Sequence, residues 1–184
     1  KVLARDSTTP AQDDPYGCKV VAADWTSPYD GLHTDNPGDL QIDHVVPLKE
    51  AHDSGGWAWS TAKKTAYAND VTDPRHLRAV SSASNESKGD KDPSNWMPPN
   101  RHDWCSYLSD WISIKARWGL TMDQSEWGRI KNLLTGCRDR ISQQKFGGDL
   151  KHGGDFADFL RRGLRVVFVL QLPDVALAGV GQLG

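Results

Sequence analysis

An aspartate and a histidine stand side by side at Asp43-His44, three residues before Pro47, in a stretch rich in β-branched residues. The chain then reads Asn85-Glu-Ser-Lys88-Gly, beginning 41 residues after His44. These residue types suit hydrolysis of a phosphodiester, in which a neutral histidine activates water. The reaction also needs a hard cation, which a carboxylate and an amide carbonyl can hold. The spacing indicates a site built from two segments that the fold must bring together.

The positions of Asp43 and His44 constrain the element that carries them. Residues 40–48 are predicted to form a strand, and neighbouring side chains on a strand point to opposite faces. The two side chains therefore diverge unless the strand bends, and Pro47 ends or bends it. We expect the site to lie at this end of the strand.

The other predicted elements before residue 100 are short. A strand is expected over residues 19–23, and a helix over 60–69 begins at Ser60, a good N-cap. Residues 77–80 predict a second short strand, which leads into the segment that carries Asn85. The pattern is that of an α+β protein with a helix inserted between two short strands.

From Asp103 onwards the pattern becomes helical, with Asp103 as the expected N-cap. Large apolar residues recur every 3.6 residues along two stripes: Trp104, Leu108, Trp111, Ile112 and Trp118, then Trp127, Ile130, Leu133 and Leu134. Gly119 is expected to end the first helix. A capping box of Thr121 and Gln124 begins the second, and Gly136 ends it. The segment predicts an α-hairpin.

The hairpin makes a prediction about the three cysteines. Cys105 lies at the start of the first helix and Cys137 just past the end of the second. Each leg is roughly 20 Å long at 1.5 Å per residue, so antiparallel legs bring the two sulfurs together. We expect a Cys105–Cys137 disulfide; the alternative is two buried free thiols. Cys18 has no assigned partner, and the absence of a C-x-x-C pair disfavours structural zinc.

Composition limits the classes of function. The 184 residues carry 22 Lys+Arg and 24 Asp+Glu, a net charge of −2, which excludes a polybasic nucleic-acid coat. Residues 63–102 nevertheless hold 7 basic against 5 acidic residues. No apolar run approaches the ~20 residues of a membrane helix, so no membrane association is predicted. The chain opens at Lys1 without a hydrophobic leader, as a processed secreted protein would, although a fragment would look the same.

Taken together, the motifs resemble the ββα-metal (His-Me) finger of HNH endonucleases, and more closely a group of secreted bacterial and fungal proteins of that family. The resemblance is carried by Asp43 to Leu48, Ala68-Asn69-Asp70, Leu77, Ala79 to Ser81, Asn85, Ser87 to Asp90, Asp92-Pro93, Trp96 and Pro98-Pro99. It spans roughly residues 1–137, which we assign to a nuclease domain. Residues 138–184 are assigned to a C-terminal extension for which no fold is predicted.

The resemblance implies a role for each site residue. His44 would be the general base, Asp43 and Asn85 the metal ligands, and Lys88 a contact to the phosphate. A third ligand that compact members often carry has no clear counterpart here, so water would complete the shell. That shell suits Mg²⁺, with Mn²⁺ as the alternative. Each residue also has a structural alternative. His44 would be a core histidine, Asp43 a turn cap, Asn85 a helix N-cap and Lys88 a solvated surface lysine.

The predicted function is a secreted, metal-dependent endonuclease that degrades DNA, with RNA left open as a substrate. Little sequence specificity is expected, since no segment resembles a base-reading helix. No obligate protein partner is predicted. The main alternative is a non-catalytic extracellular module that binds glycan or cell wall on a degenerate HNH finger. It would use Trp57 and Trp59, which share a face if they lie on a strand. A third hypothesis is a toxin or effector nuclease domain whose tail docks a partner.

Overall fold

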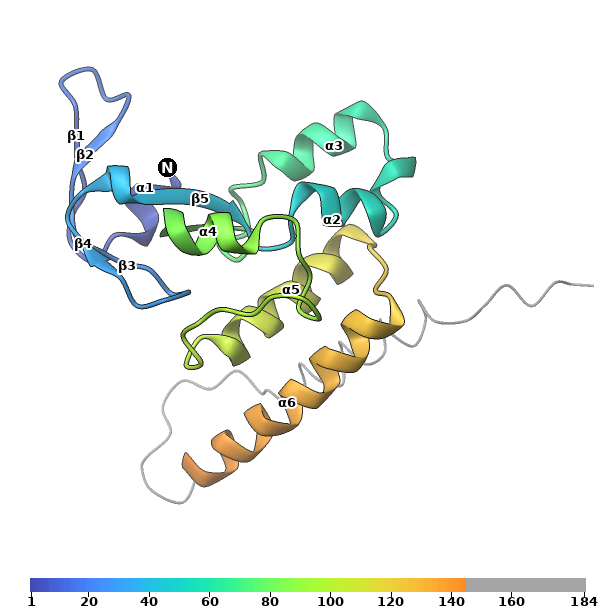
Figure 1. The fold of residues 1–184 in the computed structure, drawn as a ribbon. Helices are drawn as coiled ribbons and strands as arrows, with labels where there is room; N and C mark the ends of the chain where they lie inside the picture. Colours follow the sequence, from blue (N-terminus) through green and yellow to red (C-terminus); the bar gives the residue numbers. More distant parts are fainter. Residues whose placement is uncertain (145–184) are drawn as a thin grey trace, which may run out of the picture. The chain divides into compact units, whose positions relative to one another are not determined.

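The structure is a computed structural model that describes residues 1–144, with burial and side-chain contacts for residues 1–137 (Figure 1). The predicted extension therefore lies almost wholly outside the described residues. Within them the fold is α+β, with three small antiparallel sheets of two strands each. None of the helices in this part of the chain is long and apolar enough to cross a membrane.

The first forty residues form short elements ahead of the central strands. Their bounds are α1 (Val2–Asp6), β1 (Gln12–Asp13), β2 (Val20–Ala22), β3 (Trp25–Thr26), β4 (His33–Thr34) and the 3₁₀ helix η1 (Pro37–Asp39). β1 pairs with β2 and β3 with β4. The strand predicted over residues 19–23 is thus confirmed as β2.

The central sheet is the antiparallel pair of β5 (Leu40–His44) and β6 (Leu77–Ser81), in which Asp43 lies opposite Arg78. α4 (Ser82–Lys88) follows β6 directly and packs on both strands. The predicted second strand is confirmed. The prediction of one strand over residues 40–48 was wrong, because the strand ends at His44 and Pro47 caps a helix. Proline suits a helix start, where its missing N–H costs nothing.

Between the two strands lies an insertion of α2 (Leu48–Asp53), η2 (Gly56–Ala58) and α3 (Thr61–Ala68). The inserted helix predicted over residues 60–69 is confirmed as α3. Ser60 caps its start by accepting a hydrogen bond from the Lys63 N–H, and the Asn69 amide donates to the Thr65 carbonyl at its end. α2 and η2 were not predicted.

The Gly55-Gly56 turn determines where the two tryptophans of the insertion point. Gly55 has a left-handed φ of +116°, and a Cβ on Gly56 would lie 2.5 Å from the Ala51 carbonyl oxygen. The chain continues as the 3₁₀ helix η2 and not as a strand. Trp57 is 66% exposed, whereas Trp59 packs inward on other aromatic rings, so the two do not share one face.

The C-terminal part is the predicted α-hairpin of α5 (Trp104–Trp118) and α6 (Gln124–Gln144), which lie side by side in Figure 1. The Cys105–Cys137 disulfide is confirmed, with 5.7 Å between the Cα atoms. Gly119 ends α5 in the left-handed conformation, with φ of +68°.

Two details of the predicted helix ends were wrong. α6 does not stop at Gly136 but runs to Gln144, so Cys137 lies within it. A glycine costs only about 1 kcal/mol inside a helix and ends one only where it turns left-handed. The N-cap bond comes from Asp123, which directly precedes α6 and accepts the Glu126 N–H, while Thr121 donates its hydroxyl to the Ser54 carbonyl.

A buried cluster joins the hairpin to the insertion. The Lys115 ammonium, fully buried in α5, lies 2.6 Å from Glu50 Oε1 of α2 and 2.8 Å from Glu126 Oε2 of α6. It also donates to the Ser54 hydroxyl and the Thr121 carbonyl, both at 2.9 Å. One cation thus holds three helices together.

We predict that replacing both Cys105 and Cys137 by serine lowers the free energy of unfolding by about 3–4 kcal/mol, because the unfolded chain regains the entropy of the closed loop. Urea denaturation followed by circular dichroism measures the change. Cys18→Ser is the matched control, since Cys18 is an exposed free thiol. Equal denaturation midpoints for the double variant and the control would contradict the prediction.

A second prediction concerns pH. Burial raises the pKa of the Glu126 carboxyl to about 7, although the adjacent Lys115 ammonium lowers it. The folded state therefore binds this proton more tightly than the unfolded state, whose pKa is about 4.3. The stability that this proton contributes is fully present below the unfolded-state pKa of Glu126. It is lost as the pH rises from that pKa through the folded-state pKa.

Glu126→Gln removes that dependence. We expect the free energy of unfolding of the parent protein to fall relative to Glu126→Gln between about pH 5 and 7, by up to ~1.4 kcal/mol per pH unit. Urea midpoints across this range provide the measurement, with Glu86→Gln at an exposed position as control. A difference between parent and Glu126→Gln that stays constant with pH would refute the prediction.

Candidate active site

His44 lies at the last position of β5, with its ring half-buried against the insertion. Its Nε2 is 2.9 Å from the carbonyl oxygen of Ala68, the last residue of α3. A carbonyl can only accept, so Nε2 carries the hydrogen and Nδ1 is the basic nitrogen of the neutral ring. The ring also stacks nearly parallel to Tyr67, with centroids 6.3 Å apart and planes 12° apart. The contacts of His44 thus fix both its tautomer and its orientation.

The end of α3 holds a second histidine beside the first. The last carbonyls of a helix have no partner within it, and here the Tyr67 carbonyl accepts the Nε2–H of His76 at 2.7 Å. His76 is fully buried, and its ring meets the His44 ring edge-on at 5.6 Å. Burial lowers the pKa of His76. A neutral His76 therefore places no positive charge beside His44.

Asp43 is buried and bound on both carboxylate oxygens. Its Oδ2 accepts the Tyr29 hydroxyl at 2.6 Å, and its Oδ1 accepts the Lys88 ammonium at 2.8 Å. Lys88 is fully buried at the end of α4, and its ammonium also donates to the His44 carbonyl at 2.8 Å. Burial lowers the pKa of Lys88, while the Asp43 carboxylate raises it. Desolvation, reinforced by the same carboxylate, raises the pKa of Tyr29 well above its usual value.

Asp43, His44 and Lys88 are thus brought together at the end of β5, on two sides of it, whereas Asn85 lies beside Gln41 near the start of the strand. The side chain of Asp43 meets α4 and that of His44 meets α3, as alternation along a strand requires. Asn85 in α4 donates its amide Nδ2 to Gln41 Oε1 at 2.7 Å, two residues before Asp43 on the same face of β5. Lys88 has two protein acceptors in a buried position, and its contact with a phosphate stays a prediction.

Asp43 and Asn85 offer one carboxylate and one amide carbonyl for a cation. The Asn85 bond to Gln41 uses the amide nitrogen, which leaves the carbonyl oxygen to act as a ligand. Each carboxylate oxygen of Asp43 has two lone pairs, and Tyr29 and Lys88 each occupy one. Among the described residues, no group of three or more His, Cys, Asp or Glu is placed to hold a metal ion. Two oxygen ligands fit a hard cation that keeps most of its water, as Mg²⁺ does.

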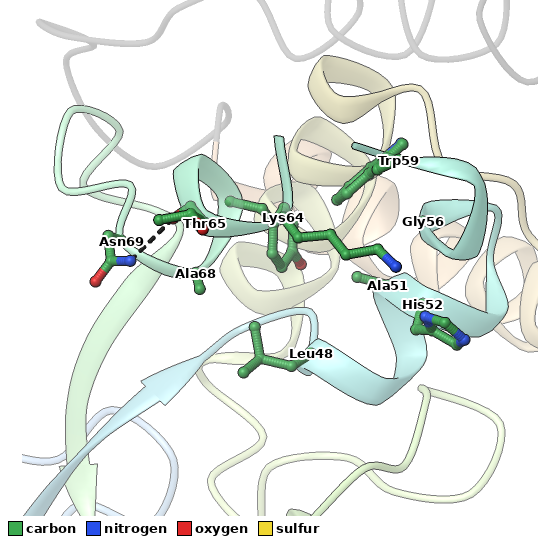
Figure 2. A pocket seen from close by; sticks show the side chains of 10 residues that line it. Leu48, Ala51, His52, Gly56, Trp59, Lys64, Thr65, Ala68 and Asn69 are labelled. Carbon is green, nitrogen blue, oxygen red and sulfur yellow. Dashed lines mark hydrogen bonds between the residues drawn. The ribbon is translucent and has the colours of Figure 1, made fainter. Parts of the chain in front are cut away.

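A cavity of ≈ 360 Å³ opens on the α3 side of His44, between α2 and α3 (Figure 2). Its wall includes Tyr67 and Ala68, the two residues that position His44. The other lining residues are Leu48, Ala51, His52, Gly56, Trp59, Lys64, Thr65 and Asn69. We call this cavity the insertion pocket.

Sequence reasoning missed two of the groups that hold the site, Tyr29 and the Ala68 carbonyl. They left no signal, since their roles depend on contacts across the fold. The sequence allows His76 to reach the site but its spacing assigns it no role; it immediately precedes β6, whose first residue pairs with His44.

Comparisons with known proteins identify the family of this chain and one relative. Residues 3–129 match the family described as the C-terminal domain of GmrSD restriction endonucleases. An uncharacterized secreted protein from Arthroderma benhamiae is 38% identical over 136 residues, a match that covers 74% of this chain and 65% of that protein. The chain thus spans about two thirds of the length of this relative. No solved structure matches.

The buried ion pair generates a prediction about stability. Lys88→Met should lower the free energy of unfolding by about 3–5 kcal/mol, because the Asp43 carboxylate stays buried without its cation. Adding Asp43→Asn should restore much of the loss, since no unpaired charge then remains. Urea denaturation measures both variants.

Lys91→Met is the matched control for this prediction, because Lys91 is exposed three residues further on. It should change the free energy of unfolding by no more than about 0.5 kcal/mol. If Lys88→Met costs no more than Lys91→Met, the ion pair does not stabilise the site.

Proposed function

We propose a nuclease function for this chain, which belongs to the family of GmrSD restriction endonuclease C-terminal domains. The proposed reaction is hydrolysis of phosphodiester bonds with His44 as the general base. One observation carries it: the Ala68 carbonyl holds Nε2–H, so that Nδ1 is left as the base at the end of β5. The order of elements, two antiparallel strands (β5 and β6) followed by the helix α4, further supports classing the core as an HNH-type ββα-metal finger.

In this mechanism the residues at the end of β5 and their contacts transfer the proton and position the base. His44 Nδ1 takes a proton from water, and the Ala68 carbonyl keeps accepting from Nε2 as the ring becomes charged. Tyr67 limits rotation of the ring by stacking on it. Lys88 binds both Asp43 and the His44 backbone, which fixes the carboxylate relative to the base.

Asp43 and Asn85 would hold a divalent cation, most suitably Mg²⁺ with Mn²⁺ as the alternative. When bound, the cation supplies a Lewis acid for the scissile phosphate and stabilises the leaving oxygen. The Lys88 ammonium, 2.8 Å from Asp43 Oδ1, holds the carboxylate in place for this role. We assign Lys88 chiefly to holding Asp43, with any phosphate contact secondary.

The proposed substrate is DNA, with RNA as a second substrate class, cleaved with little sequence preference. We further propose that the protein is secreted. Its relative from Arthroderma benhamiae carries that description, and the Cys105–Cys137 disulfide is of the kind that persists in oxidising compartments. The glycan-binding alternative is weakened because only Trp57 is left as an exposed aromatic of the pair.

His44→Ala should reduce nicking of supercoiled plasmid by about 10²–10⁴-fold, because the general base is lost. Agarose gels with purified protein in Mg²⁺ measure the rate, and His102→Ala, an exposed histidine, is the matched control. Excess EDTA should abolish the activity, and Mg²⁺ or Mn²⁺ should restore it. Nicking by His44→Ala at the parent rate would remove His44 from the role of base.

A further inference from the structure

We propose that the insertion pocket binds one unpaired nucleobase of the nucleic-acid substrate, next to the phosphate on which His44 acts. This inference rests on the proposed nuclease function and names a subsite for it. Four features of the pocket carry the proposal: its walls, its polar groups, the two residues that it shares with the surroundings of His44, and the charge around its rim.

The walls of the pocket are flat and largely apolar. Trp59 contributes a half-buried aromatic ring, the buried Tyr67 lies against that ring, and Leu48 contributes an exposed aliphatic side chain. Trp59 is held from behind, with its ring centroid 5.3 Å from that of Tyr67 and 5.7 Å from that of Trp118. A rigid aromatic wall of this kind favours a planar ligand, and every base has a π-face that can stack on it.

The pocket also has polar groups, which come from both of its helices. Thr65 and Asn69 line it from α3, and His52 lines it from α2. The Asn69 amide nitrogen is used by the Thr65 carbonyl, so its carbonyl oxygen remains as an acceptor, as Figure 2 shows. A mostly apolar pocket with a few polar groups is typical of small-ligand sites.

Two residues lie between the pocket and His44 and contact both. Tyr67 forms part of the pocket wall and stacks on the His44 ring, and Ala68 lines the pocket while its carbonyl holds His44 Nε2. In the proposed complex, a nucleotide whose phosphate lies at His44 places a neighbouring base in the pocket. A base stacked in a duplex cannot enter a concave site, which predicts a preference for unpaired or frayed strands.

The charge at the rim suits a polyanion. Lys64 is exposed on α3, and its side chain extends across the pocket in Figure 2. Lys63, its neighbour, places its ammonium 4.5 Å over the Trp59 ring. Two adjacent lysines next to an aromatic wall match the combination of backbone charge and base stacking found in single-strand binding.

The test separates base binding from catalysis. All binding variants are made in a His44→Ala background, and fluorescence anisotropy measures their affinity for a labelled oligothymidylate and for an abasic oligonucleotide of equal length. We expect Trp59→Leu to weaken oligothymidylate binding about 5–100-fold while changing abasic binding little. Trp57→Leu is the matched control, because Trp57 is exposed outside the pocket, and it should change binding less than about 2-fold.

A second variant guards against a folding defect at Trp59. Thr65→Phe adds a large side chain at an exposed helix position that lines the pocket, so it fills the site without removing core contacts. It should cause the same selective loss of oligothymidylate binding. Lys64→Ala should weaken binding of both oligonucleotides, since it acts through the phosphates.

The outcomes are distinct. Equal oligothymidylate affinity for the Trp59→Leu, Thr65→Phe and Trp57→Leu variants would overturn the pocket proposal. It would also be overturned if the His44→Ala protein without a pocket substitution bound the abasic strand as tightly as oligothymidylate. Retention on insoluble polysaccharide without oligonucleotide binding would also overturn it and favour a glycan site. Plasmid nicking by the protein with His44 intact reports on the nuclease proposal separately. Nicking with no effect of the pocket variants therefore rejects the pocket alone.

Discussion

The site depends on one buried interaction, the ion pair between Lys88 and Asp43. Lys88 reaches back from the end of α4 and binds both the Asp43 carboxylate and the backbone carbonyl of His44. A buried pair of this kind adds little net stability, because desolvation offsets the Coulomb attraction. What it contributes is a fixed geometry: two adjacent residues of one strand are held at a defined position against the helix that carries Asn85.

The other half of the site is held by a longer chain of contacts. The disulfide closes the α5–α6 hairpin, and Lys115 of that hairpin binds Glu50 in α2. From there the insertion leads to α3, whose last residue, Ala68, offers its carbonyl to His44. The base is therefore positioned by an element that is supported from outside the central sheet. The insertion between the strands is part of the site, and the hairpin supports the insertion through Lys115.

Much of the fold could be predicted because its signals are local. Ser60 and Asn69 mark the ends of α3, and Gly119 marks the end of α5. Cys105 and Cys137 lie at similar distances along the two helices from the turn between them, which is enough to pair them. The errors arose where a local signal has two outcomes. Pro47 can end a strand or begin a helix, and Gly136 can stop a helix or lie within it. In both cases packing against distant segments decides.

The site was less accessible to sequence reasoning than the fold. Asp43, His44 and Asn85 were predicted as site residues from their type and order. The groups that contact Asp43 and His44 include a tyrosine 14 residues upstream of Asp43, a buried histidine and a backbone carbonyl, which the order of residues does not reveal. Lys88 shows the difficulty most clearly. As a letter in the sequence it suggests an exposed cation, and only the packing of α4 on β5 shows that it is fully buried.

The same reasoning changes what the charge of residues 63–102 means. The tally counts Arg75, Arg78 and Lys88, yet each of these pairs with a carboxylate in the fold: Asp73, Asp103 with Asp110, and Asp43. Their positive charge is therefore balanced by these carboxylates within the protein. Lys63 and Lys64 are exposed on α3, beside the insertion pocket. A polyanion approaching His44 would therefore meet a small cationic edge on α3, and a net charge of −2 does not oppose binding at that edge.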